Sequence, residues 1–359
     1  MSDAPQARLI ECLQYLFHDV AERLSPTDPA RPFLDDCTNR LGQMARRLTA
    51  RRFVAAVVGL TKVGKSTLLS ALLGEEVAPR RNTVWSSVPV EYEYGEAFRA
   101  WVHFRKQVAR EALSCRSGGE LLDFIGKAAT EGGRYSPGLV ELVEARMPSP
   151  LLANGLVVAD TPGFGAAQPG RADAETHAKV IVEYLNRLNA RKDAFAQVYW
   201  VVRRGEGGIG SLEKRFYQEH LCGRCADVVV NYFGPEDGAH ADPASQSKFR
   251  RRYGDCFDPL VRLHFLDGMQ ALEARKSNDA MALGSSGIQT LVDSMSAMAG
   301  NAYAHQAVRD VLAIWGDLHA ALDRNLIDAS RLWTIKKSRR DEAYYQAEQC
   351  GIPLKELDA

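Results

Sequence analysis

The sequence lacks the features that would place the chain in a membrane or in an oxidising compartment. Its uncharged apolar runs are of strand length, far short of the roughly 20 residues that a membrane-spanning helix needs. The first residues, from Met1 to Pro5, lack the basic and apolar regions of a secretion signal. The seven cysteines are odd in number and scattered, which is typical of reduced thiols rather than of a disulfide framework. We therefore expect a cytoplasmic protein, with any membrane contact being peripheral.

An excess of one charge is also missing. Lys and Arg together number 45, as do Asp and Glu, so no net positive charge indicates a nucleic acid partner. The eight histidines show no paired metal-ligand spacing, and neither G-x-S-x-G nor H-E-x-x-H occurs. The C-x-x-C of Cys222 and Cys225 has no second ligand pair, so we interpret it as two ordinary cysteines. These absences argue against a nucleic-acid-binding protein, a zinc protease and a serine hydrolase.

The chain does contain a complete phosphate-binding loop. Residues 59–66 read G-L-T-K-V-G-K-S, between an apolar run at 53–58 and a helical pattern at 67–73, which is the strand–loop–helix context that the motif requires. The glycines let backbone N–H groups turn around a polyphosphate, Lys65 reaches the β- and γ-phosphates, and the Ser66 hydroxyl binds Mg²⁺. The predicted nucleotide-binding residues of this segment are Gly59, Thr61, Lys62, Val63, Gly64, Lys65, Ser66 and Thr67.

From about residue 53 to 285 strand-like and helical segments alternate, which predicts a doubly wound α/β domain over residues 51–285. Residues 88–94 alternate as an edge strand does, and residues 105–147 are expected to be a partly helical insertion. The expected strands are residues 53–58, 88–94, 156–159, 196–202, 226–230 and 261–266.

Helical patterns flank the α/β domain. Residues 1–50 carry two apolar stripes at helical spacing, separated by prolines, and residues 286–359 are helical almost to the end. A C-terminal helix packed on its own domain is one interpretation. The one that we adopt is a helical bundle formed by both flanks, so that residues 1–50 and 286–359 accompany a domain at 51–285.

A second motif occurs further along the chain, where residues 157–163 read V-V-A-D-T-P-G. An aspartate at the end of a buried strand, here Asp160, can hold Mg²⁺ through water. The following glycine, Gly163, can offer its backbone N–H to a γ-phosphate and so respond to hydrolysis. Alone, D-x-P-G is an ordinary turn sequence. After a phosphate-binding loop, it resembles the D-x-x-G motif of P-loop GTPases.

Between the two motifs, residues 82–90 read N-T-V-W-S-S-V-P-V, and here the resemblance narrows to the dynamin superfamily. A hydroxyl residue three positions before Pro89 resembles the first switch of that family, which uses a threonine to bind Mg²⁺ and to position the attacking water. Ser86 holds this position, and Ser87 and Thr83 are alternatives. The metal ligands that the resemblance implies are Ser66, Ser86 and Asp160.

The family reads guanine with the motif [NT]-K-x-D, from which this chain departs. Asn231 matches, but Tyr232 replaces the lysine and Gly234 replaces the aspartate that accepts hydrogen bonds from guanine. Guanine preference is therefore expected to be weakened, unless Glu236 or Asp237 takes over in a rearranged loop. The ring of Tyr232 can stack on the base. The nucleotide-binding candidates here are Asn231, Tyr232, Asp237 and Asp267.

Lys62 is a second departure, because several dimeric GTPases of the family have a Ser or Asn there that helps to bind a monovalent cation. Its ammonium can instead place positive charge between the β- and γ-phosphates, as an arginine finger does. The alternative is a solvent-facing loop lysine, and Arg203 and Arg204 are other candidate charges. The catalytic candidates are Lys62, Ser86 and Gly163.

The resemblance implies a Mg²⁺-dependent, dynamin-like GTPase that hydrolyses GTP to GDP and phosphate. It also implies homodimerisation across the nucleotide, and work on a membrane or in self-assembly. One alternative is a P-loop ATPase, which the degraded guanine motif favours. Another is a non-mechanical nucleotide switch that binds a protein partner.

Overall fold

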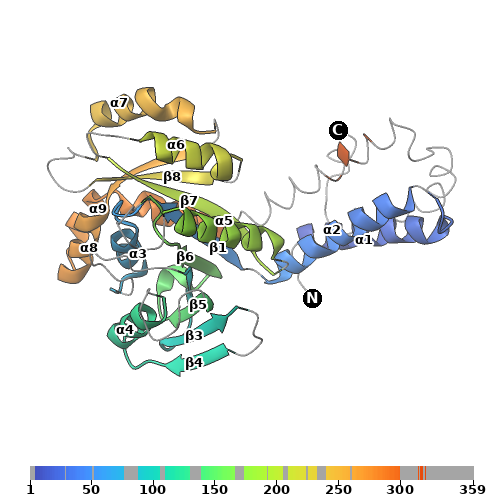
Figure 1. Cartoon of the computed structure of the whole chain (residues 1–359), viewed down its shortest axis with the longest axis horizontal. Helices are drawn as coiled ribbons and strands as arrows, with labels where there is room; N and C mark the ends of the chain where they lie inside the picture. The colour runs from blue at the N-terminus through green and yellow to red at the C-terminus, as the bar shows by residue number, and fades with distance from the viewer. Residues whose placement is uncertain are drawn as a thin grey trace. The chain divides into compact units, whose positions relative to one another are not determined.

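The computed structural model describes most of the chain up to residue 299. The described residues are 5–28, 30–50, 52–76, 88–105, 110–129, 139–165, 174–191, 193–204, 209–223, 225–232, 240–258 and 261–299, with 314, 316, 317 and 320. The chain forms two compact units (Figure 1). The helical unit comprises residues 1–52, 192–194 and 300–359, and the sheet unit comprises residues 53–191 and 195–299.

In the helical unit, α1 (Pro5–Arg23) packs against α2 (Arg31–Ala50). Each helix buries one stripe of residues three or four positions apart, as expected for helices that share an apolar seam. The buried residues are Ile10, Phe17, Val20 and Ala21 on α1, and Leu34, Cys37, Leu41 and Met44 on α2. The guanidinium of Arg40 on α2 lies 2.7 Å from the carboxylate of Asp317, so a C-terminal residue of this unit contacts an N-terminal helix.

The sheet unit is built on one nine-stranded sheet with the order β4-β3-β5-β2-β6-β1-β7-β8-β9. Strands β6, β1, β7, β8 and β9 are parallel neighbours, whereas β2 pairs antiparallel with β6. β1 and β6 are buried along their whole length, because apolar residues occupy both faces of central parallel strands. The strands are β1 (Phe53–Gly59), β2 (Val90–Tyr94), β3 (Arg99–Phe104), β4 (Arg110–Ser114), β5 (Val140–Met147), β6 (Leu156–Asp160), β7 (Phe195–Arg203), β8 (Cys225–Tyr232) and β9 (Arg262–Asp267).

Helices connect these strands, and three of them position the candidate site. α3 begins directly after the phosphate-binding loop, α8 lies beside α3, and α5 contacts β1 and β7. The helices are α3 (Lys65–Leu73), α4 (Gly118–Ala129), α5 (Ala174–Ala190), α6 (Ser211–Phe216), α7 (Pro243–Tyr253), α8 (Gly268–Ser277) and α9 (Ala280–Ser285). A π-helical turn (Tyr217–Leu221) follows α6, and residues 288–299 are helical. No helix in the described part of the chain has both the length and the apolarity needed to cross a membrane.

The expected α/β class is confirmed, but two expectations about its strands are wrong. The alternation of residues 88–94 predicts an edge strand, yet β2 lies between β5 and β6 in the sheet. Residues 105–147 are expected to be an insertion, yet β4 and β5 add this segment to the same sheet, next to the unpredicted β3. The helical residues 288–299 belong to the sheet unit, which ends at residue 299 rather than 285.

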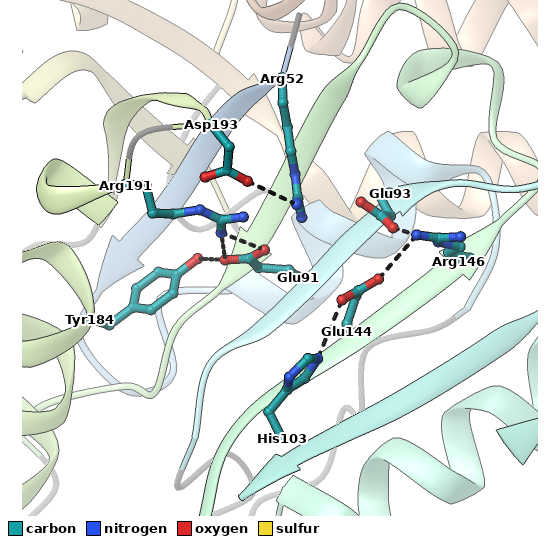
Figure 2. A network of polar contacts seen from close by, with 9 residues as sticks. All are labelled: Arg52, Glu91, Glu93, His103, Glu144, Arg146, Tyr184, Arg191 and Asp193. Carbon is teal, nitrogen blue, oxygen red and sulfur yellow. Dashed lines mark hydrogen bonds and ion pairs between the residues drawn. The ribbon is translucent and has the colours of Figure 1, made fainter. Parts of the chain in front are cut away.

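The polar side chains of β2 explain why its pattern is misleading. The Glu91 carboxylate accepts hydrogen bonds from the Tyr184 hydroxyl and the Arg191 guanidinium, each at 2.9 Å, and Figure 2 shows how these side chains meet. Glu93, on the same face of β2, pairs with Arg146 of β5. Glu91 is only 1% exposed. A buried carboxylate is tolerated when it is paired and hydrogen-bonded, so these partners let a charged strand occupy the interior of the sheet.

Candidate functional site

The candidate site lies where β1 and β6 end side by side. Val57 of β1 is in register with Asp160 of β6, and the phosphate-binding loop follows β1 directly. Open α/β sheets bind ligands at the carboxyl ends of their parallel strands. The two nucleotide motifs predicted from the sequence therefore lie together at the edge of the sheet where a ligand is expected.

The loop has the backbone conformation of an anion-binding turn. Gly64 (φ 87°) and Lys62 (φ 68°) both adopt the left-handed region, which turns successive N–H groups toward one centre. At Gly59, an added Cβ would lie 2.4 Å from the carbonyl oxygen of Val201. That position therefore requires glycine for the close approach of β7. The side chain of Lys62 is exposed.

The ammonium of Lys65 lies over the loop. Its Nζ donates hydrogen bonds to the carbonyl oxygens of Gly59 (3.0 Å) and Leu60 (2.9 Å). Burial lowers the pKa of Lys65 to about 8, and the nearby Asp160 carboxylate partly opposes this shift. The anionic oxygens of a bound polyphosphate would stabilise the charged form. Lys65 is thus a desolvated cation inside a loop shaped for phosphate.

Asp160 is the acidic counterpart of Lys65. Burial raises its pKa to about 6, and the charge of Lys65 partly opposes the shift. Its Oδ1 atom is buried and has no hydrogen-bond partner in the described part of the chain. An uncompensated carboxylate oxygen fits a hard cation such as Mg²⁺, or a water bound to it. The described residues contain no group of three acidic, His or Cys side chains that could hold a metal ion by themselves, so phosphates and water would supply most ligands of such an ion.

The segment after Asp160 is held against the phosphate-binding loop. The Phe164 carbonyl oxygen accepts from both the backbone N–H (2.9 Å) and the hydroxyl (3.2 Å) of Thr61. The Thr161 hydroxyl donates to the Val57 carbonyl at 2.7 Å. A Cβ on Gly163 would lie 2.7 Å from the Thr61 Oγ1 atom and 2.8 Å from its Cα. Gly163 therefore has no room for a side chain.

Asn231 ties the loop to α8. Its Nδ2 atom donates to the Val63 carbonyl at 3.0 Å, and its Oδ1 atom accepts from the Gly268 N–H at 2.9 Å. The side chain is only 1% exposed. Asp267, just before Gly268, caps α8 by accepting from the N–H groups of Met269 and Gln270. Both residues thus act on protein backbone in this structure.

Of the remaining residues predicted to bind nucleotide or metal, the structure describes Tyr232, Ser66 and Thr67. The Tyr232 ring is only 1% exposed, and its hydroxyl lies 3.3 Å from the Ser245 hydroxyl. It is therefore covered by protein and is not available to stack on a base in this conformation. Ser66 is half-buried, and Thr67 is buried at the start of α3. The remaining candidates lie outside the described residues. They are Ser86 with its alternatives Ser87 and Thr83, and Asp237 with Glu236 and Gly234.

Two contacts of the site have no signal in the sequence. His177 on α5 lies with its Nδ1 atom 3.2 Å from the Gly163 carbonyl oxygen. The Thr61 hydroxyl, within the loop motif at a position that the motif leaves free, contacts Phe164. A lone histidine on a helix and a threonine at a variable motif position match no pattern, so only the folded chain reveals them.

Comparison with known proteins agrees with this geometry. The dynamin family model matches residues 55–191, a range that contains the phosphate-binding loop, the Asp160–Gly163 motif and α5. The chain is similar to a bacterial dynamin-like protein from Nostoc punctiforme, with 23% identity over 270 residues that cover 68% of this chain and 36% of that protein. An uncharacterised protein in the xynA 3′ region of Caldicellulosiruptor sp. is 25% identical over 150 residues, which cover 42% of this chain and 34% of it.

The chain thus spans about a third of the length of these curated relatives. Two solved structures of an oligomerised bacterial dynamin pair, described as a mechanism for long-range sensing and tethering of membranes, also match at 15% identity. Their TM-scores are 0.47 and 0.48, and the matches cover 99% and 94% of this chain and 64% and 51% of theirs. The family match confirms the resemblance that the motifs predict.

Proposed function

Since the dynamin family model matches residues 55–191 of this chain, we propose that the chain is a dynamin-like protein that hydrolyses GTP to GDP and phosphate with the help of Mg²⁺. The observation that carries the proposal is the pair formed by Lys65 and Asp160 at the end of β1 and β6. One is a buried cation over a phosphate-binding loop, and the other is a buried carboxylate with an unpaired oxygen. This pair suits a nucleotide polyphosphate with a divalent ion.

The residues of the site have distinct roles in the proposed reaction. The loop N–H groups and Lys65 hold the β- and γ-phosphates, while Ser66 and Asp160 hold the Mg²⁺, which neutralises charge on the phosphate oxygens. The Gly163 N–H contacts the γ-phosphate, and Ser86 orients the attacking water. Phosphoryl transfer to water needs positioning and charge stabilisation rather than a protein nucleophile.

The guanine specificity of the site is proposed to be weaker than in GTPases with an intact [NT]-K-x-D motif. Asn231 supports the loop through Val63 and Gly268, and glycine stands at the position of the base-reading aspartate. A site without that acceptor leaves no buried carboxylate unpaired when adenine binds, so it discriminates little against adenine. GTP should therefore bind more tightly than ATP, by a small margin.

Calorimetric titration of the full chain with GTP, GDP and ATP in the presence of Mg²⁺ tests the proposal. Lys65→Ala should abolish tight binding of all three nucleotides while the protein stays folded, because no other buried cation faces the loop in the described residues. Near-normal GTP affinity in folded Lys65→Ala would refute the site. If ATP binds as tightly as GTP or more tightly, the protein is better described as a P-loop ATPase.

We also propose that two copies dimerise across their nucleotides and that the protein works through assembly on membranes. This part rests on the family resemblance alone. Sedimentation with anionic liposomes in the presence of GTP tests the membrane role. Nucleotide turnover without any liposome binding would favour the alternative, a switch that binds a protein partner.

A further inference from the structure

The backbone of Gly163 is contacted by a histidine from a helix further along the chain. The Nδ1 atom of His177, in the first turn of α5, lies 3.2 Å from the Gly163 carbonyl oxygen. A carbonyl oxygen can only accept, so the Nδ1 atom carries the proton in this contact. His177 is only 5% exposed, so water does not compete freely for this hydrogen bond.

The other side of Gly163 is closed by the phosphate-binding loop. The N and Cα atoms of Thr61 lie within 3.0 Å of where a Cβ of Gly163 would be. The next residue, Phe164, is fixed by the two hydrogen bonds from Thr61 and by its ring, which stacks on Phe216 with centroids 4.0 Å apart. Gly163 is therefore held between the loop on one side and His177 on the other.

The helix that carries His177, α5, is fixed to the sheet by polar contacts. Tyr184 and Arg191, at and just beyond the later turns of α5, both contact the buried Glu91 carboxylate, as Figure 2 shows. Arg187 of α5 also pairs with Glu141 of β5. A group that is held on a rigid element can define the position of a flexible neighbour.

Glycine is the residue with the greatest backbone freedom, so Gly163 alone cannot fix the direction of its N–H. We propose that His177 is a positioning residue for the γ-phosphate: it holds the Gly163 carbonyl and so fixes the peptide group after Gly163, which limits the backbone rotations that would turn the Gly163 N–H, in the preceding peptide group, away from the phosphate. The inference deepens the proposed GTPase function and rests on it. His177 does not contact the nucleotide and acts only through Gly163.

The test compares three variants of the full chain, His177→Ala, His177→Asn and His177→Gln. An asparagine amide places a donor near the Nδ1 position of histidine, whereas a glutamine amide extends beyond it. The readouts are the affinities for GDP and for the non-hydrolysable analogue GMPPNP, with kcat and KM for GTP. His264→Ala is the matched control, because His264 is a buried histidine of the same unit that bonds to Asp227 at 2.9 Å.

We expect His177→Ala to lower GMPPNP affinity about 3- to 10-fold, the effect of one net hydrogen bond, with GDP affinity within twofold of the parent. The value of kcat should fall more than KM rises. His177→Asn should recover most of the loss, His177→Gln should recover less, and folded His264→Ala should keep the parent's ratio of GMPPNP to GDP affinity.

Three outcomes would overturn the role of His177. They are an unchanged affinity ratio and kcat in His177→Ala, an equal loss for GDP and GMPPNP, and a recovery by glutamine as complete as that by asparagine. If the parent chain binds neither GDP nor GMPPNP, the proposed GTPase function itself fails. If the parent binds both and His177→Ala behaves like the parent, only the inference about His177 fails.

Discussion

The backbone conformation at Lys62 favours glycine, whereas the proposed chemistry requires a lysine. It has a φ of 68°, a left-handed conformation that costs an L-residue about 1–2 kcal/mol. Glycine would avoid this cost, although its freedom in the unfolded chain offsets about 0.5–1 kcal/mol of the gain. Such strain is a reason to look for function at the residue that bears it. An exposed lysine in this conformation is consistent with an ammonium that acts on the bound nucleotide.

Replacing Lys62 should therefore separate stability from activity. We expect Lys62→Gly to raise the free energy of unfolding by up to about 1.5 kcal/mol, and to lower kcat by a factor of ~10²–10³, the scale for loss of one transition-state donor. Urea unfolding and steady-state GTP hydrolysis in K⁺ and Na⁺ buffers measure both effects. The control is Asn278→Gly, at the other left-handed non-glycine position described (φ 55°), which should leave turnover unchanged. Turnover by Lys62→Gly within twofold of the parent in both buffers would exclude a catalytic role.

Asp160 should make stability depend on pH in a direction opposite to that of a carboxylate whose pKa is lowered by folding. Its pKa rises from 3.8 to about 6 on folding, so between these values the folded state binds more protons and stability falls as the pH rises. At pH 7 the ionised carboxylate costs at most about 3 kcal/mol, a figure that already includes its attraction to Lys65. We expect Asp160→Asn to be more stable than the parent at pH 7, with a smaller gain at pH 5.

Thermal unfolding at the two pH values measures the effect of Asp160→Asn, and its Mg²⁺-dependent hydrolysis should be strongly reduced. Lys65 sets the upper limit of the pH range in which stability is lowest, because its pKa of about 8 lies below the ordinary 10.5. The folded state loses that proton first, so stability should rise again between about pH 8 and 10.5. A parent protein that is most stable near pH 7 would contradict the predicted fall of stability up to about pH 6 and its rise above about pH 8.

At the scale of elements, Asn231 joins the phosphate-binding loop to α8, and so couples β1 to the far half of the sheet. Asn231→Ala would leave the Val63 carbonyl and the Gly268 N–H without this partner, each at a cost of about 1–3 kcal/mol. We expect a clear loss of stability, and GTP and ATP affinities that fall by similar factors, because the amide supports the loop. Chemical unfolding and calorimetry measure these changes.

The matched variant is Asp267→Ala, which removes the cap of α8 but leaves Asn231 in place. It should cost about 1 kcal/mol and affect nucleotide affinity less than Asn231→Ala does. If Asn231→Ala weakens GTP binding while ATP binding is unchanged, Asn231 acts in reading the base rather than in supporting the loop.

At the scale of the whole molecule, the chain is divided into two units, with the nucleotide site in the sheet unit. We expect the full chain to be mostly monomeric with GDP, and to double its mass with GDP and aluminium fluoride, because a γ-phosphate mimic can order the segments around Ser86 and Gly163. Multi-angle light scattering measures the mass, and Lys65→Ala is the control that should stay monomeric. A single unchanged mass with every nucleotide would exclude dimerisation of this kind.

The sequence by itself determined the features that depend on neighbouring residues. The phosphate-binding loop between β1 and α3, the Asp160–Gly163 motif after β6 and the α/β alternation are all contiguous patterns. Backbone geometry and a few side chains close together in the chain specify them. For the same reason the two helices at the N-terminus could be predicted, since each needs only an apolar stripe.

Only the tertiary structure decided the features that depend on distant partners. β2 lies inside the sheet because Tyr184 and Arg191 reach Glu91 from 93 and 100 residues away. Asn231 supports a loop 168 residues earlier, and the Tyr232 ring is covered by protein. His177 meets Gly163 because α5 packs onto the sheet. Such contacts bring charges and hydrogen-bonding groups together only after the chain has folded, so no local pattern of residues could predict them.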